Sequence, residues 1–177
     1  HRMNGGKLYF GRQASDTAYQ LGLSALTGKN DTVGTTDIQA LDFRVLLEPE
    51  FARGYDYPAR FSWMGEVLFN QREIAPGVSN NANGAWTLVD YQFKPAHHLG
   101  AGAEYTQGRL DKSLTSRAYS AHYSWYYSPH ARLQVQARRL DVDGGDSGME
   151  VLLQWNIVLG AHSERPFLAI LPMDDKM

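Results

Sequence analysis

The chain has 177 residues, no cysteine and a formal net charge of −2. This length suits one domain of ordinary size, and the lack of cysteine excludes disulfides and Cys-ligated metal centres. No run of 18 apolar residues is present, which excludes a membrane-spanning helix, and a near-neutral charge without a Lys/Arg block argues against nucleic-acid binding.

Apolar residues recur at every second position in eight segments, which is the pattern of strands with one apolar face. In chain order the segments are 19–25, 41–47, 61–69, 85–93, 99–105, 119–127, 131–137 and 151–159. Within the apolar sets only Gly65 and Thr87 are neither apolar nor aromatic, and no position is charged. A ninth short segment, 7–11, is expected to be another strand or the stump of one.

The opposite faces of these segments are polar and carry the charged residues that the segments contain. We expect this polar face to form a charged inner wall made of Asp42, Arg44, Glu66, Asp90, Glu104, Arg132, Arg138 and Glu150. Two interpretations of the wall stay open. Its charges either pair with one another and plug a narrow barrel, or they form a constriction that filters solutes.

Two architectures fit such strands. In a soluble lipocalin-like barrel the apolar faces point inward, whereas in an outer-membrane barrel they point at lipid. Aromatic residues near the ends of the apolar sets, such as Tyr19, Phe69 and Tyr127, favour the membrane barrel, because aromatic girdles lie at both membrane interfaces. Strand cores of about nine to eleven residues also match a tilted membrane crossing.

The connections between the segments also favour the membrane barrel, because short and long connections alternate along the chain. Segments 94–98 and 128–130 are tight, whereas 72–84, 108–116 and 141–148 are longer, polar and rich in small residues. Outer-membrane barrels show this asymmetry between periplasmic turns and extracellular loops. The alternation predicts that the connection 28–36 lies on the extracellular side. It also predicts that the connection 48–60 lies at the periplasmic rim, although this segment is long for a periplasmic turn.

The C-terminal part resembles a known family. Residues 149–167 look like a closing strand and resemble the ending of a Gram-negative outer-membrane porin/receptor-like family that finishes in a Gly-Ala-His-Pro-Ala-His-Pro-Phe pattern. Residues 126–135 resemble the penultimate hairpin of that family. The resemblance covers 118–167 and implies an outer-membrane barrel with a C-terminal assembly signal. Two departures are Arg165, which stands where the pattern has its second His, and the tail 168–177.

Two other candidate sites have less support. His122 and Ser124 share the polar face with Glu104 and Glu150, which suggests a Ser–His–acid hydrolase like the small outer-membrane lipid A deacylases. No Asn follows the Ser, however, and hydrogen bonding within the lumen is the preferred interpretation. His97, His98, His130 and His162 are expected at the periplasmic rim, where solvated histidines are more common than metal ligands.

The sequence therefore predicts an all-β fold, an antiparallel up-and-down transmembrane β-barrel of eight or more strands. Residues 1–16 form an N-terminal segment or strand stump, 17–167 the barrel and 168–177 a tail. The apolar face of the closing strand is expected to meet lipid through Val151, Leu153, Trp155, Ile157 and Leu159.

The expected function is porin-like passage or binding of small polar solutes in a bacterial outer membrane, without catalysis, cofactor or metal. Expected partners are outer-membrane lipid and lipopolysaccharide, the barrel-assembly machinery and the solutes, with oligomers possible and no nucleic acid. The alternatives are a lipid hydrolase using Ser124 and His122, a non-conducting anchor barrel, and a soluble lipocalin-like barrel.

Overall fold

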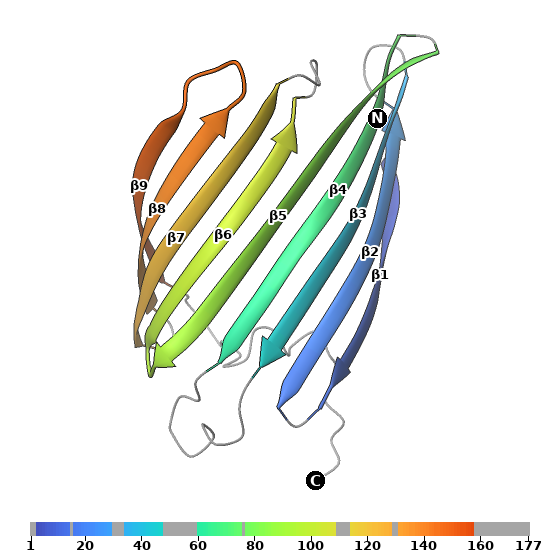
Figure 1. The fold of residues 1–177 in the computed structure, drawn as a ribbon. Coiled ribbons are helices and arrows are strands. Elements are labelled where there is room, and N and C mark those ends of the chain that lie inside the picture. Colours follow the sequence, from blue (N-terminus) through green and yellow to red (C-terminus); the bar gives the residue numbers. More distant parts are fainter. Residues whose placement is uncertain are drawn as a thin grey trace.

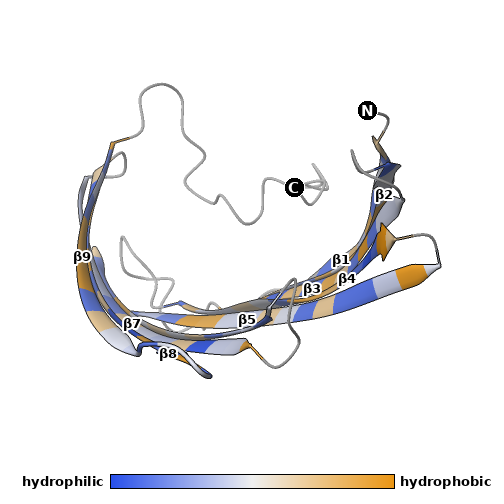
Figure 2. Ribbon diagram, turned by 90° about the horizontal axis from the view of Figure 1, so that it is seen from above, coloured by the Kyte–Doolittle hydropathy of each residue, from blue (hydrophilic) through white to orange (hydrophobic). Residues whose placement is uncertain are grey.

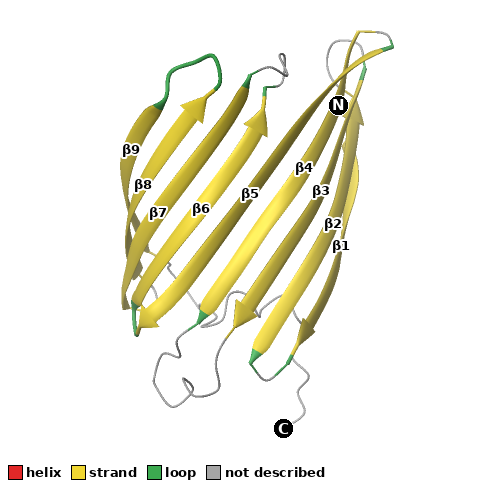
Figure 3. Ribbon diagram, viewed as in Figure 1, coloured by secondary structure: helices red, strands yellow, loops and turns green. Residues whose placement is uncertain are grey.

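Nine β-strands make up the described part of the chain, and it contains no helix (Figures 1 and 3). The structure is a computed structural model that describes residues 3–14, 16–29, 34–47, 60–75, 77–108, 114–128 and 131–157. The strands are β1 Met3–Gln13, β2 Thr17–Lys29, β3 Thr35–Leu47, β4 Phe61–Ala75, β5 Val78–Lys94, β6 His97–Gln107, β7 Thr115–Ser128, β8 Ala131–Val142 and β9 Gly148–Ile157. In these ranges no helix is long and apolar enough to cross a membrane.

The strands form one sheet in the order of the chain, and every neighbouring pair is antiparallel. The predicted all-β, up-and-down fold is therefore confirmed, and each of the eight predicted segments contributes a strand. The segment 7–11 belongs to β1, which pairs with β2 from Met3 opposite Gly28 to Gln13 opposite Ala18. β1 is thus a full member of the sheet.

The two faces of the sheet differ in chemistry and in exposure. The sheet is curved (Figure 2), and large apolar side chains such as Tyr19, Leu23 and Phe69 are exposed on its convex face. Polar side chains on the concave face crowd together, and Asp42, Gln92 and Ser124 are each less than 7% exposed. Alternation along a strand, which sends successive side chains to opposite faces, separates the two sets.

The predicted closure into a barrel is not seen within the described residues. There β1 and β9 each pair with a single neighbour, β2 and β8 respectively. Figure 2 shows the sheet as an open arc whose two edge strands stand apart. What is established is therefore a curved nine-stranded antiparallel sheet.

The long loop predicted over residues 72–84 is wrong. β4 continues to Ala75 and β5 begins at Val78, so a two-stranded hairpin extends past the apolar zone. Gln71 stands opposite Asn81, and Glu73 stands opposite Ser79. Most residues here are polar on both faces, with Ile74 and Val78 as exceptions, so the ladder of backbone hydrogen bonds continues without the regular apolar alternation that marks a strand in sequence.

The other described connections agree better with the predicted alternation of short turns and long loops. Residues 95–96 form a tight turn in which Ala96 has φ 67°, a left-handed conformation. Longer connections cover 108–114 and 143–147 at the opposite end of the strands (Figure 1). Most of the predicted rim segment 48–60, together with the tail 168–177, lies outside the described residues.

Candidate functional site on the concave face

The concave face gathers the charged residues that the sequence assigned to an inner wall. Each has the alternation parity of the polar face, because even-numbered residues of β3 to β9 point to this side. The set is Asp42 and Arg44 on β3, Glu66 on β4, Asp90 on β5, Glu104 on β6, Arg132 and Arg138 on β8, and Glu150 on β9. Most of these side chains form pairs along the wall.

The densest cluster surrounds Asp90. Its Oδ1 lies 2.7 Å from Nδ1 of His98 on β6, and its Oδ2 lies 3.0 Å from Nε2 of His122 on β7. The three side chains are between 8% and 21% exposed. One carboxylate therefore holds two imidazoles, and each ring keeps one nitrogen that is not bonded to Asp90.

Gly100 makes the longer of these two contacts possible. Gly100 on β6 stands between Asp90 on β5 and His122 on β7 in the register of the sheet. A Cβ atom at Gly100 would overlap the imidazole of His122, so the ring occupies the space that a side chain would fill. The glycine lets a side chain on β7 reach over β6 to a partner on β5.

The cluster continues toward β8 through aromatic and amide groups. The ring of Tyr126 lies 4.8 Å from that of His98, and Nη1 of Arg132 donates to the Tyr126 hydroxyl at 3.3 Å. Oγ of Ser124, a residue only 2% exposed, donates to Oε1 of Gln134 at 3.2 Å. Contacts from Asp90 through His98 and Tyr126 to Arg132 thus cross four strands, β5 to β8, and a separate hydrogen bond between Ser124 and Gln134 joins β7 to β8.

A second cluster joins β6, β8 and β9. The Arg138 guanidinium donates through Nη2 to Glu104 at 2.9 Å and through Nη1 to Glu150 at 3.0 Å. Glu104 and Glu150 are about half exposed at the side chain, so water screens these pairs and their net contribution to stability is small. The main effect of these pairs is to fix the positions of the three charged side chains on the concave face.

Two further contacts involve residues that sequence reasoning did not assign to the wall. Nζ of Lys7 on β1 lies 2.7 Å from Oδ2 of Asp42 on β3, reaching past Gly22, where a Cβ atom would overlap the Asp42 carboxyl group. Nε1 of Trp86 donates to Oε2 of Glu66 at 3.1 Å. Extending the polar alternation into residues 7–11 would have found Lys7, whereas Trp86 is apolar and gave no such signal.

The hydrolase pair does not assemble in this arrangement. His122 and Ser124 both lie on the concave face, as predicted, but His122 bonds to Asp90 and Ser124 bonds to Gln134. Among the described residues no hydrogen bond joins the Ser124 hydroxyl to the His122 ring, which a serine nucleophile needs for activation.

The histidines predicted at the periplasmic rim do not all lie on one face. His98 faces the concave side, whereas His97 stacks near Tyr123 on the other face, with its Nδ1 2.7 Å from the tyrosine hydroxyl. His130 and His162 lie outside the described residues. Among the described residues, no group of three or more His, Asp or Glu is arranged to hold a metal ion.

The convex face forms an exposed apolar surface, which we call the apolar belt. In β9 it includes Val151, Leu153, Trp155 and Ile157, which are 53–72% exposed, while Leu159 lies outside the described residues. Aromatic contacts recur toward one end of the strands: Nε1 of Trp155 donates to the Tyr127 hydroxyl at 2.6 Å, and Trp125 lies beside Tyr127.

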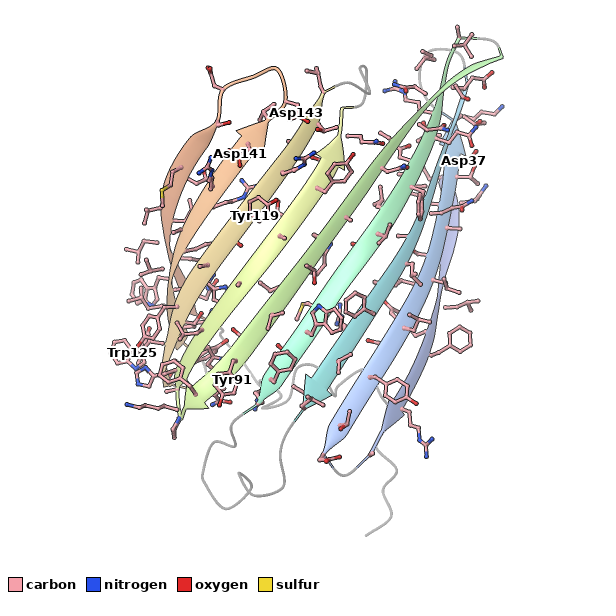
Figure 4. The ribbon with its side chains drawn as sticks, in the orientation of Figure 1. Asp37, Tyr91, Tyr119, Trp125, Asp141 and Asp143 are labelled. Carbon is pink, nitrogen blue, oxygen red and sulfur yellow. The ribbon has the colours of Figure 1, made fainter. Side chains whose placement is uncertain are left out.

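The belt ends in polar residues at the other end of the strands. In Figure 4 Asp37, Asp141 and Asp143 lie at one end, and Tyr91 and Trp125 lie toward the opposite end. Tyr119 lies between these two groups (Figure 4) and is 54% exposed. The convex surface is therefore banded along the strand direction.

Comparison with known proteins adds no family to this description. No protein-family model matches the chain, and no curated protein or solved structure shows significant similarity to it. The fold and the site define the chain as an antiparallel up-and-down sheet with one apolar and one charged face.

Proposed function

We propose that this sheet is part of the wall of a bacterial outer-membrane β-barrel. In this proposal the apolar belt faces lipid, and the concave face lines a lumen that small polar solutes enter or cross. No covalent chemistry is involved. The lumen charges would select solutes electrostatically.

The observation that carries the proposal is the exposure of the apolar belt. Exposed apolar patches on soluble monomers rarely exceed a few hundred Å², because larger ones drive association. Here exposed large apolar side chains occur on every strand, from Leu8 and Phe10 on β1 to Leu153 and Trp155 on β9. A surface of this kind needs an apolar environment, and a bilayer supplies one along the whole length of the sheet.

The concave face supports a lumen that contains water. Its charges pair between neighbouring or next-but-one strands, as in the contact of Arg138 with Glu104 and Glu150. Pairs of this kind lie flat along the wall. Side chains that filled a narrow barrel would instead meet across its centre.

Lipid and lipopolysaccharide are the expected contacts of the belt. The proposed route to the membrane, through the barrel-assembly machinery, follows from the resemblance of residues 118–167 to outer-membrane barrels.

The decisive experiment is conductance across planar bilayers containing the purified protein. Discrete current steps are the expected result. Glu104→Gln combined with Glu150→Gln should lower the preference for cations, because it removes two negative charges from the lumen face. Asp141→Asn removes one charge beyond the belt on the convex face (Figure 4) and should leave ion selectivity unchanged.

A preparation that inserts into bilayers but never conducts would contradict solute passage. The protein would then be better described as a non-conducting anchor barrel.

A further inference from the structure

Asp90, His98 and His122 form a unit that can change its charge without losing a hydrogen bond. His98 reaches Asp90 through Nδ1 at 2.7 Å, and His122 reaches it through Nε2 at 3.0 Å. In a neutral imidazole one nitrogen carries the proton and the other is an acceptor. When the nitrogen beside Asp90 carries the proton, the second nitrogen of each ring can still take one up.

Proton uptake reverses the formal charge of this unit. An ionised carboxylate with two neutral imidazoles carries −1, and the same carboxylate with two imidazolium rings carries +1. Histidine ordinarily changes its charge between about pH 5 and 8, whereas carboxylates stay largely ionised down to about pH 5.5. The contacts with Asp90 are kept and become charge-assisted, so the unit charges in place.

The residues that face the unit do not compensate this change. The positions directly opposite its members on β4, β7 and β8 are uncharged: they are Ser62, Ser124 and Gln136. Beyond them the Tyr126 ring lies 4.8 Å from that of His98, and Arg132 donates to the Tyr126 hydroxyl.

On the β4 side the charged neighbour of the unit is Arg60. Its backbone carbonyl accepts a hydrogen bond at 2.8 Å from the backbone N–H of Gln92, the residue opposite His98. Arginine and tyrosine do not ordinarily change charge between about pH 5.5 and 8. The charge of this region therefore changes through the two imidazoles.

The unit is placed where a change of charge is felt. The side chains of His98 and His122 are 12% and 8% exposed, and that of Asp90 is 21% exposed. Partly buried charges are screened less by salt than exposed ones. Gly100 contributes to this placement, because the His122 ring occupies the space above it on the concave face.

We infer that Asp90, His98 and His122 form a pH-sensitive charge switch on the concave face, negative while the rings are neutral and positive once both are protonated. In the proposed lumen, on which this inference rests, the switch regulates which ions enter. Its local field favours cations in the first state and anions in the second.

Nuclear magnetic resonance of histidine-labelled protein in lipid nanodiscs measures the protonation directly. We expect the ring signals of His98 and His122 to titrate between about pH 8 and 5.5. His98→Gln and His122→Gln assign these signals. If either ring stays neutral at about pH 5.5, the inference is overturned, whether or not the protein conducts.

Reversal potentials across planar bilayers in a potassium chloride gradient test the effect on ions. Salt near 0.1 M keeps the screening length at about 10 Å. Lowering the pH from about 8 to 5.5 should shift the reversal potential toward anion selectivity. Either single variant should reduce this shift to roughly half, because one of two protonation sites is lost, and the double variant should abolish it.

His97→Gln is the matched control. His97 adjoins His98 in β6 but lies on the convex face, hydrogen-bonded to Tyr123, so this variant should keep the full shift. A full shift that persists in the double variant, or one that His97→Gln abolishes, would overturn the inference.

The two measurements separate the charge switch from the proposed passage of solutes. Rings that titrate in a protein that never conducts would contradict passage and support the switch. Conductance with the same ion selectivity at both pH values would support passage and overturn the switch.

Discussion

At the scale of single residues, Gly100 shows how a missing side chain creates a contact. The His122 ring lies over Gly100 and reaches Asp90 on the far side of the strand. Gly22 does the same for Lys7 and Asp42. In both places a glycine inside a strand, which normally weakens it, is explained by the close approach of a neighbouring side chain.

Gly100→Ala should therefore destabilise the sheet by about 1–3 kcal/mol, the usual cost of overpacking, and should displace His122 from Asp90. Gly84→Ala on β5 is the matched control, because its nearest neighbours would lie 3.6 Å from the new Cβ, an ordinary contact. Urea unfolding of the protein in detergent micelles measures both. Equal stability of the two variants would show that the ring of His122 does not cover Gly100.

Position along β9 should decide how much an arginine introduced on the apolar belt lowers the stability of the protein in a bilayer. Leu153 lies in the middle of Gly148–Ile157, whereas Trp155 lies near its end and hydrogen-bonds to Tyr127. In a bilayer, Leu153→Arg should cost about 2–4 kcal/mol, and Trp155→Arg should cost less because it lies closer to the interface. Gln154→Arg, on the concave face, should be milder than Leu153→Arg. Free energies of unfolding measured in liposomes test this order, and equal costs at 153 and 154 would contradict a lipid-facing belt.

At the scale of elements, the β4–β5 hairpin is the main departure from the sequence prediction. Residues 72–84 carry turn-forming and polar residues, which indicated a loop, yet backbone pairing continues to Ala75 opposite Val78. Glu73 accepts a hydrogen bond from the backbone N–H of Gly77 at 3.2 Å, and Gly77 has φ 74°. Hydrophobic alternation reports where a strand has a continuous apolar face, so it cannot locate a stretch of strand that lacks one.

The two ends of the sheet should differ in access from outside the cell. An epitope tag inserted after Gly77 is expected to bind antibody on intact cells, because this hairpin lies at the end assigned to the extracellular side. A tag inserted after Ala96, in the tight turn at the opposite end, should bind antibody only after the outer membrane is permeabilised. Flow cytometry of intact and permeabilised cells distinguishes the two, and the reverse pattern would invert the proposed orientation.

At the scale of the whole molecule, the apolar belt predicts how the protein behaves in solution. Without lipid or detergent the belt is exposed to water on all nine strands, so the folded protein should associate or precipitate. Analytical ultracentrifugation with and without a mild detergent measures this, with circular dichroism to confirm that the β-structure is retained. A folded monomer in plain buffer would exclude the membrane proposal and favour a soluble barrel.

The sequence by itself determined the strands and the two faces. A period of two is a local property, because the face to which a side chain points follows from its position in its own strand. The chain therefore predicts an apolar set and a polar set of residues in every segment. The same reasoning correctly assigned Asp42, Asp90, Glu104 and Arg138 to one face.

Only the tertiary structure decided which of these residues meet. The contacts of Asp90 with His98 and His122, and of Lys7 with Asp42, depend on the register between strands and on glycines that leave room above β6 and β2. Register, curvature and the open arc between β1 and β9 depend on pairings between different strands. Periodicity along one strand fixes only which face each residue takes, so it excludes slips of one residue but does not say which residues stand opposite each other.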